Sequence, residues 1–170
     1  MALSKISRKC LPCTACCQGW LKIETPIAKA SFGNACQHCS SMGCTIYESR
    51  PVEPCQKFVC AWLIHDSDLP AWMRRDRSHA IVMTDRLRWN NRPVITVTYT
   101  VSPAPFQTRD WLYKYSDVSG MPLVTIEFLS DRGKTTHKKI LSTHGPKDFS
   151  LEIMDRFNRG EQLWYIAKLY

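Results

Sequence analysis

Nine cysteines crowd into the first part of this 170-residue chain, and they constrain its folding more than any other feature. All of them lie between Cys10 and Cys60, and none follows. The number is odd, and no apolar stretch behind the basic N-terminus resembles a secretory signal, so disulfides are less expected than metal ligation or redox chemistry in a reducing compartment. The sequence therefore predicts a cytoplasmic protein whose chemistry is localised before residue 64.

The first four cysteines form a CxxCxxCC run, Cys10-Leu-Pro-Cys13-Thr-Ala-Cys16-Cys17. Two cysteines separated by two residues can curl around one metal, with backbone N–H groups directed at their sulfurs. The side chains of the adjacent Cys16 and Cys17 diverge in most backbone conformations, so we expect them to serve different metals or different atoms of one cluster. A single four-ligand site built from this run alone is not expected.

Five further cysteines make one or two centres possible. If Cys55 and Cys60 shared one straight helix, they would point about 140° apart, so either the helix breaks before Cys60 or the two serve separate sites. Zinc and iron–sulfur clusters both accept four cysteines, and the loop-rich, knuckle-like spacing favours zinc only slightly. The five cysteines are Cys36 and Cys39, which form a second CxxC around His38, and then Cys44, Cys55 and Cys60.

Residues beyond the cysteines extend this pattern. The run is followed by Gly33-Asn-Ala-Cys36, by Gly43-Cys44-Thr-Ile46-Tyr47-Glu-Ser-Arg50-Pro51, and by Cys55, Phe58, Cys60 and Trp62. Over residues 10 to 62 the chain thereby resembles the YkgJ-type cysteine-cluster family, which is described as zinc- or iron-chelating. That family is similar in turn to the cysteine-rich part of flagellin lysine N-methylases, which raises methyl transfer as an activity. The sequence has no glycine-rich nucleotide loop to support that chemistry.

The resemblance implies a set of metal ligands. Cys39 falls where we expect an apolar residue in relatives, so it is either a spare thiol or a substitute ligand, and His38 is a further candidate. Arg50 is expected to donate hydrogen bonds to the thiolates, or alternatively to bind a substrate. The implied ligands are Cys10, Cys13, Cys16, Cys17, Cys36, Cys44, Cys55 and Cys60.

Sheet and helix signals dominate the cysteine-free part. The alternating VITVTYTV of residues 94–101 predicts a strand with three threonines on one face, and residues 80–84, 123–129 and 135–141 predict others, the last two joined by a turn at Asp131-Arg132-Gly133. Thr108 and Asp148 are expected to cap helices, the second of which Gly160 would end. Residues 163–170 fit either a strand or a helix.

Shorter helices are predicted nearer the cysteines. One begins at Pro51 and carries Cys55, with apolar positions at Phe58 and Trp62. Another is short and covers residues 71–73. The prediction is an α+β protein in which a loop-rich cysteine module (residues 1–64) packs on a small mixed domain with an antiparallel sheet (residues 65–170).

The positive charge first suggests nucleic-acid binding. The formal net charge is +8, but eight thiolates bound to two divalent ions would lower it to about +4. The basic stretch at residues 74–77 is expected to be a solvated face. Because no apolar run approaches the roughly 20 residues of a membrane span, no membrane association is expected.

Three functions remain open on these grounds. The first is a metal-binding protein of bacterial type that serves storage, delivery or structural support. The alternatives are a metal- or iron–sulfur-dependent enzyme with redox or methyl-transferring activity, and a zinc-stabilised nucleic-acid-binding protein. The sequence names no catalytic residue, substrate or protein partner.

Overall fold

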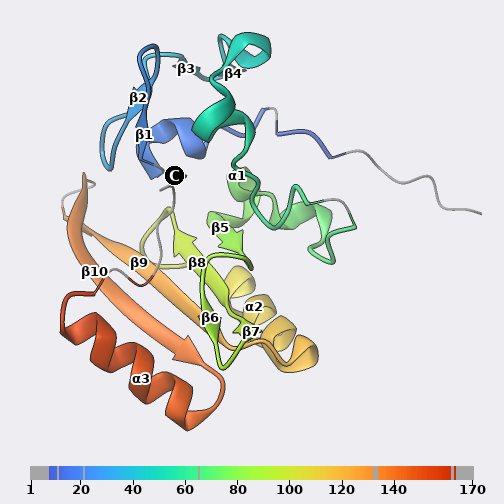
Figure 1. Ribbon diagram of the computed structural model, residues 1–170, viewed down its shortest axis with the longest axis vertical. Helices are drawn as coiled ribbons and strands as arrows, with labels where there is room; N and C mark the ends of the chain where they lie inside the picture. The colour runs from blue at the N-terminus through green and yellow to red at the C-terminus, as the bar shows by residue number, and fades with distance from the viewer. Residues whose placement is uncertain are drawn as a thin grey trace, which may run out of the picture. The chain divides into compact units, whose positions relative to one another are not determined.

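The computed structural model of the chain describes residues 8–10, 12–20, 22–64, 66–131, 134–161 and 163 (Figure 1). The chain divides into two compact units, one ending at Asp76 and the other beginning at Arg77. The first unit contains the nine cysteines, and the second contains a four-stranded sheet with the helices α2 and α3. The α+β class is confirmed, and the boundary lies after Asp76, whereas the sequence analysis placed it after residue 64.

Short elements make up the first unit, as expected of a segment organised around ligands. Its strands form two antiparallel pairs, β1 with β2 and β3 with β4. η1 and η3 are π-helical turns, and η2 and η4 are 3-10 turns. The elements are η1 (Cys16–Trp20), β1 (Ile23–Glu24), β2 (Lys29–Ala30), β3 (Cys39–Ser40), β4 (Gly43–Cys44), η2 (Tyr47–Ser49), η3 (Val52–Gln56), η4 (Ala71–Met73) and α1 (Arg75–Ser78), which crosses the boundary between the units.

The helix expected from Pro51 onward is shorter than its apolar pattern indicates. η3 ends at Gln56, and Glu53 within it has non-helical backbone angles (φ −112°, ψ 134°). The helical conformation therefore ends before Cys60, which is the first of the two alternatives that the spacing of Cys55 and Cys60 left open. The short helix expected at residues 71–73 is present as η4.

Gly19 holds η1 against the loop that follows β2. Its φ is +90°, and a Cβ built on it would lie 2.4 Å from the backbone oxygen of Ser31 and 2.8 Å from that of Asn34. Only glycine combines a positive φ with such a close approach of two backbones. The turn that begins with the adjacent cysteines is thus fixed to the loop that contains Ser31 and Asn34.

The sheet of the second unit has the strand order β10-β9-β8-β5. Both outer pairs are antiparallel, as predicted, and the central pair of β8 and β9 is parallel. A parallel pair requires a crossover, and α2 lies between these strands in sequence. The elements are β5 (Ala80–Met83), β6 (Arg88–Trp89), β7 (Arg92–Pro93), β8 (Ile95–Tyr99), α2 (Phe106–Ser119), β9 (Leu123–Asp131), β10 (Lys134–His144) and α3 (Lys147–Asn158), with β6 and β7 forming a separate hairpin.

Strand β8 is the centre of the core. All five of its residues are buried, including the threonines of the polar face, Thr96 and Thr98. The hydroxyl of Thr96 donates to the backbone oxygen of Met83 in the neighbouring strand at 3.3 Å. The helices also contribute to this core: Leu112 of α2 and Phe149 of α3 are both fully buried.

Both predicted helix caps are wrong, although both helices exist. α2 is preceded by Pro105, so Thr108 lies within the helix, where its hydroxyl donates to the backbone oxygen of Ser78 at 2.8 Å. α3 is preceded by Pro146, which leaves Asp148 in the first turn. A carboxylate there still interacts favourably with the helix dipole. Gly160 has φ +75° just after α3, as expected of a helix-ending glycine.

Two predictions fall partly or wholly beyond the described residues. Arg132 and Gly133 of the expected turn lie outside them, although β9 and β10 on either side pair in antiparallel register, with Lys134 opposite Asp131. Of the undecided segment 163–170, only Leu163 is described, and its side chain is buried. Among the helices that the structure describes, none has the length and apolar character needed to cross a membrane.

Candidate metal centre

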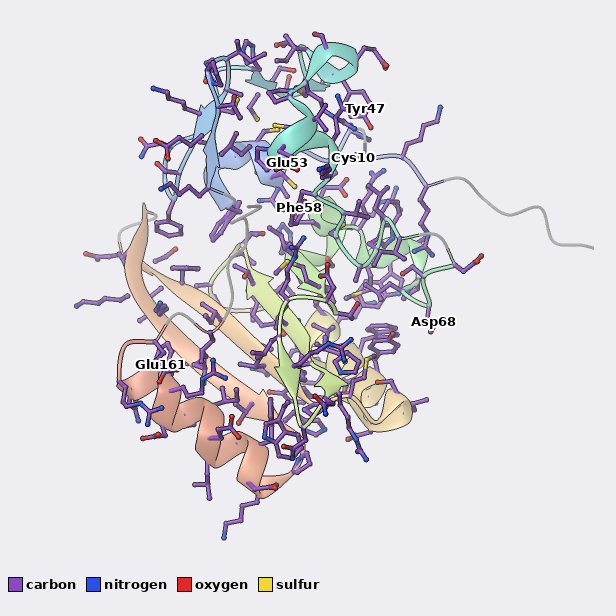
Figure 2. The ribbon with its side chains drawn as sticks, viewed as in Figure 1. Cys10, Tyr47, Glu53, Phe58, Asp68 and Glu161 are labelled. Carbon is purple, nitrogen blue, oxygen red and sulfur yellow. The ribbon has the colours of Figure 1, made fainter. Side chains whose placement is uncertain are left out.

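One cavity in the first unit collects most of the implied ligands. Its volume is about 80 Å³. Tyr47, Arg50 and Phe58 contribute to its wall, and Figure 2 labels Cys10, Tyr47 and Phe58 among its lining residues. Seven of the eight implied ligands line it: Cys10, Cys13, Cys16, Cys17, Cys36, Cys44 and Cys55. Segments far apart in sequence thus bring their thiols to one partly open cavity.

The two CxxC motifs fold into the same kind of turn. The N–H of Cys13 donates to the oxygen of Cys10 at 2.8 Å, and the N–H of Cys39 donates to the oxygen of Cys36 at 2.9 Å. A further bond joins the two motifs, since the N–H of Cys36 donates to the oxygen of Cys17 at 2.7 Å. The backbone alone therefore sets the first run of cysteines beside the second.

The adjacent Cys16 and Cys17 have different thiol neighbours. Burial raises the pKa of Cys16 well above its usual range, and the nearby thiols that add to this rise include Cys10, Cys13 and Cys60. Burial also raises the pKa of Cys17 to about 12, but the thiols that contribute most there are Cys44, Cys39, Cys36 and Cys55. These different surroundings agree with the divergence expected of adjacent cysteines.

The remaining thiols fall into the same two sets. Burial raises the pKa of Cys10 to about 11, with Cys13 and Cys60 as its strongest thiol neighbours. Burial raises the pKa of Cys55, and its thiol neighbours are Cys36 and Cys44. We call Cys10, Cys13, Cys16 and Cys60 the first thiol group, and Cys17, Cys36, Cys44 and Cys55 the second thiol group. The groups adjoin each other, because Cys44 also contributes to the raised pKa of Cys10.

Cys60 does not line the cavity but belongs to the first group by its contacts. Burial raises its pKa, and Cys13 adds to that rise, whereas the backbone N–H groups of Trp62 and Leu63 lower it by hydrogen bonding to the sulfur. A thiolate that accepts backbone N–H bonds needs less help from a metal to carry its charge. Cys60 thus has the backbone environment that the sequence analysis expected for metal-binding cysteines.

Arg50 lies between the two groups. Its guanidinium stacks on Tyr47, with the central carbon 3.8 Å from the ring centroid. Its positive charge opposes the burial-driven rise in the pKa of Cys10, in the first group, and of Cys55, in the second. The Nε atom is buried and has no hydrogen-bond partner among the described residues. Arg50 therefore favours thiolates by its charge, and the hydrogen bonds expected of it are not formed by this nitrogen.

The basic stretch at residues 74–77 is only partly the solvated face that was expected. Asp76 and Arg77 are exposed, but Arg74 and Arg75 are half-buried. Burial lowers the pKa of Arg75, while the nearby Cys13 and Cys16 raise it. Arg74 bonds to Asp76 at 2.6 Å and also lies near Cys13. Sequence reasoning missed this placement, because four consecutive charged residues are typical of a solvated face, even though the adjacent Met73 is buried.

His38 lines the cavity but is held by the backbone. Its Nε2 lies 2.8 Å from the oxygen of Ile27. A carbonyl only accepts, so Nε2 carries a hydrogen and Nδ1 is the ring nitrogen left for a metal. The role of His38 as a ligand stays a prediction.

The donor set fits a thiophilic metal, although no coordination shell is formed as the side chains stand. Within the described parts of the chain, no three His, Cys, Asp or Glu side chains are arranged so that they could hold an ion. What the structure provides is nine free thiols: the eight implied ligands in two adjoining sets, with Cys39 beside the second set and three arginines nearby. Tetrathiolate sets suit both zinc and iron–sulfur centres.

Comparison with known proteins adds no relative. No family model, curated protein or solved structure matches this chain. The resemblance to the YkgJ-type family therefore stays a prediction, and the site is argued from its own geometry.

Proposed function

We propose that this chain is a metal-binding protein whose two thiol groups each hold one divalent metal ion, with zinc favoured. The observation that carries the proposal is the cavity that seven implied ligands share. Four cysteine thiolates are the usual ligand set of a structural zinc ion, and they release their protons when they bind it. The eight thiols match two such sets.

The size of the cavity supports an ion over an organic substrate. Small-molecule sites usually enclose roughly 300–1,000 Å³, whereas this cavity measures about 80 Å³. On the same measure a cavity of about 10–15 Å³ holds one water molecule, so the space suits a few small groups. Redox or methyl-transfer chemistry on a substrate would need room that the cavity lacks, and we rank the enzyme alternative lower for that reason.

Charge also supports thiolate-bound metal. Eight thiolates with two divalent ions carry a local charge of about −4, and Arg50, Arg74 and Arg75 lie among or beside them. Arg50 and Arg75 offset part of that charge in a partly buried site, whereas Arg74 shares its charge with Asp76. Arg74 and Arg75 belong to the basic stretch at residues 74–77, which a nucleic-acid-binding protein would use to contact phosphates. Their position near the thiols therefore weakens the nucleic-acid alternative.

Thiolate sites of this density need a compartment that keeps cysteines reduced, and we place the protein in the cytoplasm on that basis. Within the module the ions add to a small apolar core that includes Ile23, Phe58 and Met73, so structural support is the simplest role. Storage and delivery of metal are served by the same ligands. The rate at which the ions exchange separates these roles, because a delivery site must release its ion without unfolding.

The test is metal analysis of protein purified without oxygen and without added metal. We expect about two zinc ions per chain and a colourless solution. A brown solution with acid-labile sulfide would show that the protein carries an iron–sulfur centre and not zinc. Nine titratable thiols in folded, metal-free protein would overturn the proposal altogether.

A further inference from the structure

Cys39, the ninth cysteine, faces an implied ligand across a strand pair. β3 and β4 are antiparallel, with Cys39 opposite Cys44 and Ser40 opposite Gly43. The N–H of Thr45 donates to the oxygen of His38 at 2.9 Å. Because these two residues flank the cysteines, Cys39 and Cys44 form a non-hydrogen-bonded pair, in which side chains share a face and the Cα atoms lie about 4.5 Å apart.

This position meets the geometric requirement of a disulfide. A disulfide needs Cα atoms about 4.4–6.8 Å apart and Cβ atoms that approach each other, and the non-hydrogen-bonded pair provides both. Both thiols are free. Each is half-buried, and the intervening Ser41 and Met42 are exposed, so a small oxidant can reach the hairpin from solvent.

Cys39 is also the cysteine whose loss from the metal site costs least. It does not line the cavity, whereas Cys44 does. It lies near the second thiol group, as Cys36 and Cys55 do, but the ligand set that the family resemblance implies is complete there without it, with Cys17, Cys36, Cys44 and Cys55. A bond between Cys39 and Cys44 would therefore remove one ligand from a set of four and leave the first thiol group complete.

We propose that Cys39 and Cys44 form a reversible disulfide when the protein meets a peroxide, and that this bond releases the metal of the second thiol group. The release rests on the proposed function, whereas the formation of the bond does not. The Cys39 thiolate attacks one oxygen of hydrogen peroxide, which forms a sulfenic acid as the O–O bond breaks and hydroxide leaves. The Cys44 thiolate then attacks that sulfur, and the S–O bond breaks as the disulfide forms.

Two thiols and one hydrogen peroxide thus give one disulfide and two waters, with two electrons passing from sulfur to peroxide. A dithiol reductant reverses the reaction by thiol–disulfide exchange. Cys39 is then the residue that makes the second thiol group sensitive to oxidants. The first thiol group has four cysteines and no spare thiol in such a pair.

The experiment adds one equivalent of hydrogen peroxide to the full-length, metal-loaded protein. Peptide mapping without reduction is expected to find Cys39 linked to Cys44, and a chromogenic chelator to detect about one zinc ion released per chain. Cys39→Ser should bind the same amount of metal as the unchanged protein but form no such link and retain its zinc. A dithiol added to the oxidised protein should restore metal binding.

The competing bond is the one within the second CxxC, between Cys36 and Cys39. The Cys36→Ser variant distinguishes the two disulfides. In this variant the Cys39–Cys44 link should still form, whereas a Cys36–Cys39 link could not. A peptide map dominated by Cys36–Cys39, or equal zinc loss from Cys39→Ser, would overturn the inference. If the protein proves to carry no metal, the proposed function fails, yet the peptide map still decides whether this pair forms.

Discussion

Removing one thiol from either group should cost one metal ion per chain, and double variants test whether the groups are separate. Cys16→Ser takes a thiol from the first group and Cys17→Ser takes one from the second, although the two residues are adjacent. A structural zinc ion contributes about 10–16 kcal/mol, so one of four thiolates accounts for roughly 2.5–4 kcal/mol. Since 1.4 kcal/mol is a factor of ten, each substitution should weaken its own site by roughly 100- to 1,000-fold.

Double variants carry the sharper result. Both thiols that raise the pKa of Cys55, Cys36 and Cys44, belong to the second group, so Cys17→Ser combined with Cys55→Ser should still retain about one ion. Cys16→Ser combined with Cys55→Ser removes a ligand from each group and should retain none. The control is Cys39→Ser, which should retain both ions. The assay is elemental analysis of anaerobically purified protein after dialysis against a chelator that leaves the unchanged protein fully loaded.

The reasoning is refuted if the same-group double variant loses both ions. That outcome would mean that the eight thiols hold one shared polynuclear cluster, because the loss of ligands from one group would then release all of the bound metal. Retention of an ion by the cross-group variant would refute the assignment of Cys55 to the second group. Normal loading of both single variants would show that Cys16 and Cys17 are not ligands.

Three further predictions follow from the first unit. Removing the metal with a chelator should unfold this unit and leave the second, because about 10–16 kcal/mol per zinc ion rivals the whole stability of a domain; peptide-resolved hydrogen exchange checks this. Gly19→Ala should lower the free energy of unfolding by more than the roughly 1–2 kcal/mol of a left-handed residue, since its Cβ would meet the oxygen of Ser31 at 2.4 Å. Gly33→Ala is the control in urea unfolding, because its φ of +78° is similar but no atom lies within 4 Å of the added Cβ. Arg50→Gln should weaken zinc binding by about 10–100-fold in chelator competition, the usual effect of losing a group that supports metal ligands, whereas the exposed Arg77→Gln should change it little.

The strands of the second unit could be predicted from sequence because they are rich in β-branched and aromatic residues, which in places alternate with threonines or other polar residues. β8 is the clearest case, since VITVTYTV alternates along its length. The pattern did not reveal that β8 and β9 run parallel, which depends on the crossover through α2. It also did not reveal that Thr96 and Thr98 are buried. A strand face made of threonines can be exposed to solvent or covered by another layer of the fold, and only the tertiary packing determines which of the two occurs.

The helix caps show where local chemistry misleads. Threonine is a good capping residue, and Thr108 lies near the start of α2, so the prediction was reasonable from the sequence. The hydroxyl instead bonds to the oxygen of Ser78, thirty residues earlier in the chain. Such a partner is invisible in a sequence window, and burial of the residue makes the distant bond more favourable than a cap.

In the candidate site, the sequence and the family resemblance together indicated which cysteines to examine, and seven of those eight line one cavity. The sequence predicted the division into two thiol groups only in part: it indicated that the side chains of the adjacent Cys16 and Cys17 diverge, but not which other cysteines accompany each of them. The pairing of Cys39 with Cys44 could not be predicted, because two-residue strands have no periodicity to set their register. Gly43, with φ +125°, was the one local signal of a tight hairpin there.

Net charge illustrates why the arrangement matters more than the total. The formal charge of +8 assumes neutral thiols, and it suggests a surface that attracts phosphates. Arg50 and Arg75 are instead placed beside cysteines, and burial lowers the pKa of Arg75, so part of the positive charge is held away from solvent. Buried cations beside thiols are costly unless the thiols ionise, and thiols with a raised pKa ionise near neutral pH only when a metal displaces their protons. On the proposed function, the arginines that first suggest nucleic-acid binding serve instead as counter-ions of a metal–thiolate centre.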